Sequence, residues 1–155
     1  KNVKTKYFSI FNADGSFDPY ELEAMHSKIK NNSLDLLLAS RYKKNASSED
    51  DTLITLIGNK IFTLLGKIFF SLPISDILYT YVMGDTQKIL NLNLQQKDFT
   101  LCVELPIKAK RKNLNIADIA ANEKSRIGGT KKVNALRDGF LILIHMVTLF
   151  FKNEK

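Results

Sequence analysis

The decisive stretch of the chain is Ile10-Phe11-Asn12-Ala13-Asp14-Gly15-Ser16-Phe17-Asp18-Pro19. It ends an apolar-rich run, residues 3–11, which predicts a buried strand, and it leads directly into a predicted helix. In open α/β sheets, side chains just beyond the carboxyl end of a strand lie where ligands bind. Asp14 is therefore a candidate ligand for a divalent cation, which prefers oxygen ligands and can hold a phosphate in turn. The alternative is an ordinary tight turn, because Asn, Asp and Gly all suit turns.

The residues after this turn predict a parallel crossover. We expect Asp18 to cap a helix, Pro19 to occupy its first position and Glu21 to reach back to the cap. The helix is expected to end near Asn31. The nearly continuous apolar run 34–39 then predicts a second strand that is covered on both faces. Strand, helix and strand in close succession imply two strands with the same direction.

Composition limits the class of protein. The chain has 155 residues, 45% of them hydrophobic, which suits one domain or most of one. Its formal net charge of +7 favours anionic partners such as nucleotides, phosphates or anionic lipid, although a Lys-rich composition can also be a simple bias. Nucleic acid is disfavoured, because the basic residues are not interleaved with aromatic ones.

The cysteine and histidine content excludes several kinds of site. Cys102 is the single cysteine, so the chain can form no internal disulfide and no cysteine-type zinc site. With only His26 and His145, a histidine metal site or catalytic triad is not expected. The sequence begins at Lys1, already close to its first predicted strand and without a signal-peptide pattern, so we interpret it as the C-terminal part of a longer protein.

Two segments are unusually apolar. The segment 53–71, which Asp51 or Thr52 can cap, predicts a helix that is apolar over most of its circumference. We expect this helix to be buried in the core, with contact to a membrane surface as the alternative.

The second apolar segment lies near the end of the chain. The run 139–151 is shorter than the roughly 20 residues that cross a bilayer. Cations stand on both sides of it, at Lys131, Lys132, Arg137, Lys152 and Lys155. This arrangement predicts a helix lying in a membrane interface, with a core helix or part of a membrane hairpin as alternatives.

Five separated signals follow one another in a fixed order. They are Asn12-Ala13-Asp14, Ala39-Ser40-Arg41-Tyr42, Asp76, Glu104 and Arg126-x-x-Gly129-x-x-Lys132. Their order and spacing, over about residues 3–140, resemble the second half of family 2 glycosyltransferases. The branch concerned includes dolichol-phosphate mannose synthases and bacterial polyprenyl-phosphate sugar transferases. The resemblance implies an incomplete GT-A-like α/β domain with a mostly parallel sheet over residues 1–132, followed by an apolar helix over 133–155.

The resemblance also implies a metal and phosphate site. Asp14 matches the second aspartate of the family's Asp-x-Asp metal motif, and Asn12 stands where the first aspartate would be. Asn keeps a carbonyl ligand but lacks the charge, so Mg²⁺ or Mn²⁺ is expected mainly at Asp14. Arg41, Arg126 and Lys132 are implied to face the phosphates of a nucleotide-sugar donor, with exposed basic residues as the alternative.

Two acidic residues are implied to be catalytic. Asp76 opens a segment that in the family reads Asp-x-Thr-Ser-Gly-Phe-Arg, but here the rest departs from that pattern and Val82 replaces the cation. Glu104 lies within an apolar run, and burial raises the pKa of a carboxyl group. The resemblance therefore suggests Glu104 as a general base or acceptor-positioning group, with helix capping as the alternative.

The function implied is metal-assisted transfer of a sugar from a nucleotide-sugar to an acceptor. The acceptor implied is a polyprenyl phosphate at the cytoplasmic face of a membrane, and we expect the chain alone to bind the donor poorly. The alternative function is a non-catalytic, basic membrane-surface module, a degenerate relative of the family. The missing aspartate at Asn12 and the missing cation at Val82 favour that alternative.

Overall fold

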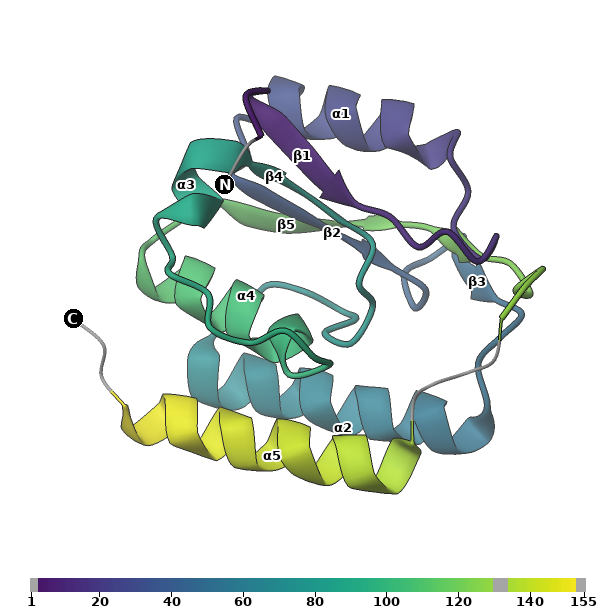
Figure 1. Cartoon of the computed structure of the whole chain (residues 1–155), viewed down its shortest axis with the longest axis vertical. Helices are drawn as coiled ribbons and strands as arrows, with labels where there is room; N and C mark the ends of the chain where they lie inside the picture. The colour runs from purple at the N-terminus through teal and green to yellow at the C-terminus, as the bar shows by residue number, and fades with distance from the viewer. Residues whose placement is uncertain (1–2, 130–133, 153–155) are drawn as a thin grey trace.

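A mixed four-stranded sheet forms the centre of the protein (Figure 1). The computed structural model describes residues 3–129 and 134–152. The strands of the sheet, in the order in which they lie side by side, are β1 (Tyr7–Ile10), β4 (Val82–Asp85), β2 (Leu36–Ser40) and β5 (Ile116–Ala120). β2 and β5 are parallel neighbours, whereas β4 runs antiparallel to both β1 and β2.

The expectation of a mostly parallel sheet is therefore only partly correct. β1, β2 and β5 share one direction, as the predicted crossover requires, but β4 lies between β1 and β2 in the opposite direction. Asp76, which precedes β4, contacts Arg41 directly after β2. Because the chain enters β4 from the carboxyl edge of β2, β4 has to run back toward the other edge.

Helix α1 (Glu21–Asn31) covers one face of the sheet (Figure 1). Met25 and Ile29 are buried there, in a cluster with Leu37 and Tyr81. The predicted cap is wrong in detail. Tyr20 is the N-cap residue, and Asp18 Oδ1 accepts the backbone N–H of Tyr20 at 3.0 Å. Glu21 turns away from the helix end, because its Oε1 accepts the backbone N–H of Asn122 at 2.8 Å.

Three helices form two layers on the other face. Helix α4 (Leu101–Arg111) lies against the sheet, and α2 (Leu53–Phe70) and α5 (Ala135–Phe151) lie side by side beneath it (Figure 1). Pro106 lies inside α4. α5 contributes three buried residues, Ile142, Met146 and Leu149, to the same apolar core as the sheet.

Three short elements were not predicted. β3 (Ser47–Ser48) and β6 (Asn122–Glu123) pair in parallel and join two loops that are far apart in the sequence. α3 (Thr86–Leu90) directly follows β4, and Asp85 caps it by accepting the backbone N–H groups of Gln87 and Lys88. These elements depend on pairing partners or on a cap after a very short strand, so they leave no periodic pattern in the sequence.

Helix α2 contradicts the expectation that it is buried. Thr52 caps it as predicted, but its three buried residues are Asn59, Thr63 and Gly66. Its exposed face is made of large apolar side chains, namely Leu53, Ile54, Ile57, Ile61, Leu64, Ile68 and Phe69. The polar groups point inward because Asn59 donates a hydrogen bond to Asp76 and Thr63 Oγ1 accepts the backbone N–H of Ile77.

Candidate functional site

Four of the predicted site residues gather at the carboxyl edge of the sheet. Asp14 follows β1, and Arg41 follows β2. Arg126 follows the short pairing that continues β5, and Asp76 precedes the antiparallel β4. Because β1, β2 and β5 end at the same edge, segments that are more than a hundred residues apart in the sequence meet there.

Asp14 lies in a turn that its own side chain stabilises. Its Oδ1 accepts hydrogen bonds from the hydroxyl of Ser16 at 2.7 Å and from the backbone N–H of Ser16 at 3.1 Å. Its Oδ2 lies 3.6 Å from Nη1 of Arg126. The bonds from Ser16 and the positive charge of Arg126 lower the pKa of Asp14. The carboxylate is therefore ionised at neutral pH and able to act as an anionic ligand.

The basic loop folds over this turn. The backbone carbonyl of Asp14 accepts the N–H groups of Ile127 at 2.8 Å and Gly128 at 3.4 Å. Gly15, with a φ of +84°, passes so close to the Ile127 side chain that an added Cβ would meet it at 2.8 Å. Arg126 is held between two carboxylates, because its Nη2 also lies 3.2 Å from Asp50 Oδ2.

The residues predicted to hold a divalent cation, Asp14 and Asn12, both lie in the turn after β1. No group of three or more His, Cys, Asp and Glu side chains suited to a metal occurs within residues 3–129 and 134–152. Asp14 Oδ2 and the side-chain carbonyl of Asn12 would supply two oxygen ligands. Mg²⁺ and Mn²⁺ accept such sparse protein coordination, because water and substrate phosphates complete their shell.

Arg41 is engaged from several directions. Its Nε lies 2.8 Å from Asp76 Oδ2, its Nη2 lies 3.1 Å from Asp76 Oδ1, and its Nη1 lies 3.2 Å from Glu123 Oε2. Its guanidinium carbon lies 4.6 Å from the ring centre of Tyr79, a cation–π contact. Burial alone would lower the pKa of Arg41, but the hydrogen bond to Asp76 and the charges of Asp76 and Glu123 outweigh burial and raise the pKa, so the cation is permanent.

This arrangement gives Asp76 and Arg41 a shared role. Asp76 is 0% exposed and accepts hydrogen bonds from the side chains of Arg41 and Asn59. A buried carboxylate and guanidinium in bidentate contact stabilise each other and fix the geometry after β2. In this conformation, the charge of Arg41 is neutralised by the protein, so a phosphate would have to compete with Asp76 and Glu123.

Glu104 lies apart from these residues, on α4. It is 1% exposed, and its carboxylate accepts the backbone N–H groups of Gln95 and Gln96 at distances of 2.9–3.1 Å. Lys108 Nζ lies 3.0 Å from Glu104 Oε1. The expected rise in the pKa of Glu104 is wrong. Burial favours the neutral form, but the bonds from Gln95, Gln96 and Lys108 outweigh it and lower the pKa.

A second buried network was missed in the sequence. Asp118 Oδ2 accepts the backbone N–H of Ser75 at 2.7 Å, and its Oδ1 pairs with Lys43 Nζ at 2.5 Å. Burial raises the pKa of Asp118, but Lys43 and Ser75 lower it more strongly. The available signal was an acidic residue inside a strand with alternating apolar positions. Glu123 and Asp50, the further partners of Arg41 and Arg126, gave no such signal.

The structure thus brings the predicted residues together in pairs. Asp14 meets Arg126, and Arg41 meets Asp76, whereas Glu104 contacts neither pair. Lys132 lies outside the described residues.

An apolar pocket adjoins this edge of the sheet. It has a volume of about 220 Å³ and lies between the end of β1 and the start of α4. Ile10, Leu38 and Leu105 are among the apolar residues that line it, and Lys97 and Asp98 supply charged groups. For comparison, a cavity of roughly 150 Å³ holds a benzene molecule. The pocket could therefore hold a short hydrocarbon segment.

Among the described residues, α2 alone is long and apolar enough to cross a membrane by length and composition. No protein-family model matches the chain, and no curated protein matches it significantly.

Proposed function

We propose that this chain forms part of a glycosyltransferase that moves a sugar from a nucleotide-sugar donor to an acceptor. The observation that carries the proposal is the pairing of Asp14 with Arg126 at the carboxyl edge of the sheet. A carboxylate suited to a divalent cation and the guanidinium of Arg126 then lie side by side, which suits a diphosphate. The resemblance to family 2 glycosyltransferases supports the same reading.

The chemistry needs stabilisation of negative charge on the leaving group. When the bond between the sugar and the diphosphate breaks, charge grows on the phosphate, and fixed cations lower the energy of that state. In this proposal Arg126 exchanges its contact with Asp14 for one with the diphosphate. A bound Mg²⁺ or Mn²⁺ would neutralise the same diphosphate, with Asp14 and Asn12 as its protein ligands. Lys132 is proposed to face the donor phosphates as well.

The two other acidic residues are assigned to positioning. Asp76 holds Arg41 beside the site through a bidentate contact. Glu104 fixes the backbone of Gln95 and Gln96, directly before the pocket-lining residues 97–99. In the proposal, Glu104 therefore acts by shaping the acceptor pocket, and its low pKa keeps it ionised while it does so.

The acceptor proposed is a polyprenyl phosphate at the cytoplasmic face of a membrane. The apolar pocket beside β1 supports this choice, because its volume of about 220 Å³ suits one isoprene unit of the hydrocarbon chain. Lys97 among the lining residues provides a cation for the acceptor phosphate.

Donor turnover by the complete protein that carries this chain is the deciding experiment. Asp14→Ala should abolish metal-dependent hydrolysis or transfer from a panel of nucleotide-sugars, and a chelator should do the same to the unaltered protein. Asp18→Asn is the matched control, since Asp18 lies in the same turn but pairs with Lys124. Turnover that survives both Asp14→Ala and the chelator would contradict the metal assignment.

A non-catalytic membrane-surface module is the second candidate. The observation that favours it is the engagement of Arg41 by both Asp76 and Glu123, which leaves that cation neutralised. Under this reading, the complete protein binds lipid vesicles and shows no metal-dependent donor turnover with any nucleotide-sugar tested.

A further inference from the structure

Helix α2 is apolar on both sides, because Phe62, Leu65 and Phe70 pack against the core and further large apolar side chains are exposed. Asn59, Thr63 and Gly66, spaced by four and three residues, face the protein interior. A stripe with the same spacing faces outward and consists of Ile54, Ile57, Ile61, Leu64 and Ile68, each at least 50% exposed. An ordinary surface helix places its apolar stripe inward. The outward stripe therefore needs an apolar environment other than the protein core.

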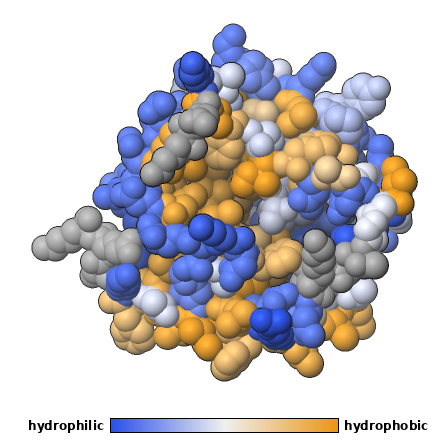
Figure 2. All heavy atoms as spheres, viewed as in Figure 1, coloured by the Kyte–Doolittle hydropathy of each residue, from blue (hydrophilic) through white to orange (hydrophobic). Residues whose placement is uncertain are grey.

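Helix α5 continues the same surface. Its buried side is Ile142, Met146 and Leu149, so it is firmly packed on the core. Its exposed side carries a second stripe at alternating spacings of four and three, formed by Leu136, Phe140, Leu143, Val147 and Phe150. The two helices touch through the rings of Phe69 and Phe150, whose centres are 5.6 Å apart. Figure 2 shows apolar residues along the side of the molecule where α2 and α5 lie in Figure 1.

The two stripes together form what we name the α2–α5 face. Contiguous exposed apolar surface of this kind marks a protein–protein or membrane interaction site. The basic residues around this face favour a membrane over a protein partner. Lys60 and Lys67 are exposed on α2 and, seven residues apart, lie on one side of that helix. Exposed Arg137 lies near the start of α5.

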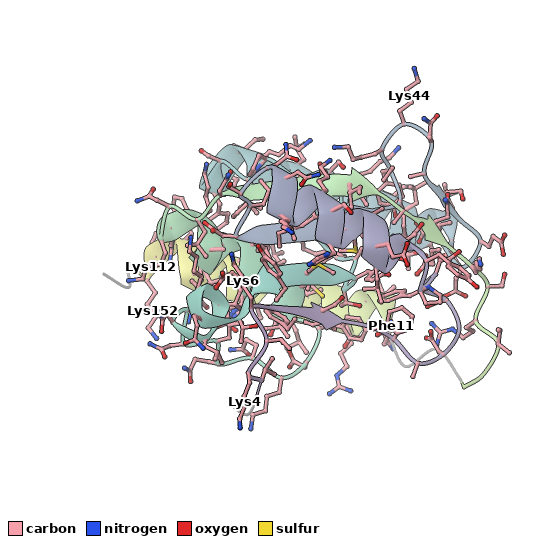
Figure 3. The ribbon with its side chains drawn as sticks, turned by 90° about the horizontal axis from the view of Figure 1, so that it is seen from above. Lys4, Lys6, Phe11, Lys44, Lys112 and Lys152 are labelled. Atoms are coloured by element: carbon pink, nitrogen blue, oxygen red, sulfur yellow. The ribbon has the colours of Figure 1, made fainter. Side chains whose placement is uncertain are left out.

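More cations lie at one end of this face. Arg111 Nη1 donates to the backbone carbonyl of Lys152 at 3.0 Å, which joins the ends of α4 and α5. Figure 3 shows Lys112 and Lys152 close to each other, at the end of the molecule away from Phe11. Apolar side chains bordered by Lys and Arg fit an anionic lipid surface, with hydrocarbon below the headgroups and phosphates around the rim.

We infer that the α2–α5 face lies flat in the interface of a membrane that contains anionic phospholipid. α2 does not cross the bilayer, although its length and composition would allow it. Asn59 and Thr63 bind Asp76 and the backbone of Ile77 and Leu78, so a spanning position would break these buried hydrogen bonds. An in-plane helix keeps them and still buries the outward stripe.

The inference is independent of sugar transfer. Vesicle binding needs only the α2–α5 face, whereas donor turnover needs Asp14 and Arg126. A failure of vesicle binding would leave the turnover experiment to decide the catalytic proposal, and the reverse also holds. A polyprenyl-phosphate glycosyltransferase and a membrane-surface module both act at a membrane, and the α2–α5 face is the surface that contacts its anionic lipid.

Sedimentation with vesicles tests the inference on the whole chain. We expect binding to vesicles of phosphatidylcholine mixed with phosphatidylglycerol, and about tenfold weaker binding to phosphatidylcholine alone. The double variants Ile57→Gln/Ile61→Gln and Phe140→Gln/Val147→Gln should each reduce binding about tenfold or more, because the replaced side chains are exposed and no longer enter hydrocarbon. Leu90→Gln on α3, 45% exposed and away from the face, should bind as the unaltered chain does.

A second measurement determines the depth of insertion. The chain contains no tryptophan, so Ile61→Trp provides a single fluorescent reporter on the outward stripe. We expect quenching by lipids brominated near the headgroup end of the acyl chain and little quenching by lipids brominated near the chain end.

Three results would overturn the inference. They are absence of vesicle binding by the unaltered chain, equal binding by the face variants, and strongest quenching from the bilayer centre. The heptad-like spacing of both stripes also suits a partner helix. A stable dimer in sedimentation equilibrium that the face variants abolish, together with no binding to vesicles, would assign the face to a second copy of the chain.

Discussion

The side-chain amide of Asn59 donates a hydrogen bond to the carboxylate of Asp76. Asn59 is 1% exposed and Asp76 is 0% exposed, so the contact is fully inside the protein. It joins helix α2, whose outer surface is the α2–α5 face, to the residue that holds Arg41 at the sheet edge. The proposed lipid-facing surface and the candidate site are therefore connected through two side chains.

Asn59→Leu should destabilise the fold by about 1–3 kcal/mol, because it leaves a buried carboxylate oxygen of Asp76 without its amide donor. Denaturant unfolding measures the change. Lys60→Gln, one residue further and exposed on the same helix, should change stability by less than about 0.5 kcal/mol. Equal effects of the two substitutions would show that the bond to Asp76 contributes nothing specific.

Arg41 and Asp76 should behave as a coupled pair. Arg41→Met or Asp76→Asn alone should cost about 3–5 kcal/mol, because each removes the bidentate partner of a buried charge. The double variant should cost less than the sum of the two single ones. The measurement is a double-mutant cycle by denaturant unfolding, and strict additivity would contradict the coupling.

Glu104 should make the protein more sensitive to acid. Its pKa in the folded protein is below the ordinary value of 4.5, so its contribution to stability is complete above that pH. The contribution is lost as pH falls from about 4.5 through the folded-state pKa. Glu104→Gln should therefore lower the free energy of unfolding at pH 7 by about 1–3 kcal/mol and by less near pH 2. A difference that stays constant with pH would contradict this assignment.

The two glycines of α2 should respond in opposite ways to alanine. An added Cβ at Gly58 meets no atom within 4 Å, so Gly58→Ala should stabilise the helix by about 0.5–1 kcal/mol. A Cβ at Gly66 would lie 3.0 Å from Ile77 Cδ1 and 3.1 Å from Leu72 Cδ1. We expect Gly66→Ala to lose this gain or to destabilise the protein, and thermal unfolding of the two variants compares them directly.

Donor binding by the 155-residue chain should be weak. The candidate site offers charges that suit a diphosphate, but the resemblance assigns no residue of this chain to the base or the ribose. We therefore expect a Kd of about 1 mM or weaker for nucleotide-sugars with Mg²⁺ in titration calorimetry. Micromolar binding would contradict this expectation.

Much of the local structure could be predicted from the sequence. The strand before Asn12, the strand 34–39 and the helix capped by Thr52 follow from runs of apolar residues and from cap residues. The antiparallel β4 could not, because a four-residue strand has too short a pattern to reveal its direction. Its place between β1 and β2 is set by pairing with residues far away in the sequence, such as Phe8 and Leu36 with Gly84.

The candidate site was predictable residue by residue but not as an arrangement. Asp14 and Arg126 were named separately, and only folding of the basic loop over the turn brings them to 3.6 Å. For Glu104, the predicted direction of the pKa shift was wrong. Its burial was correctly expected, but the backbone N–H groups of Gln95 and Gln96 come from a loop whose path the sequence does not define.

The sequence by itself determined that α2 is an almost wholly apolar helix and that acidic and basic residues follow the strands. These properties depend on neighbours within one or two turns of chain, so they are local. The tertiary structure decided which side of α2 faces inward. Asn59 and Thr63 satisfy buried polar groups around Asp76, so the side of α2 that carries them faces inward. These contacts join groups far apart in the sequence, and they leave the stripe of Ile54, Ile57, Ile61, Leu64 and Ile68 on the outside.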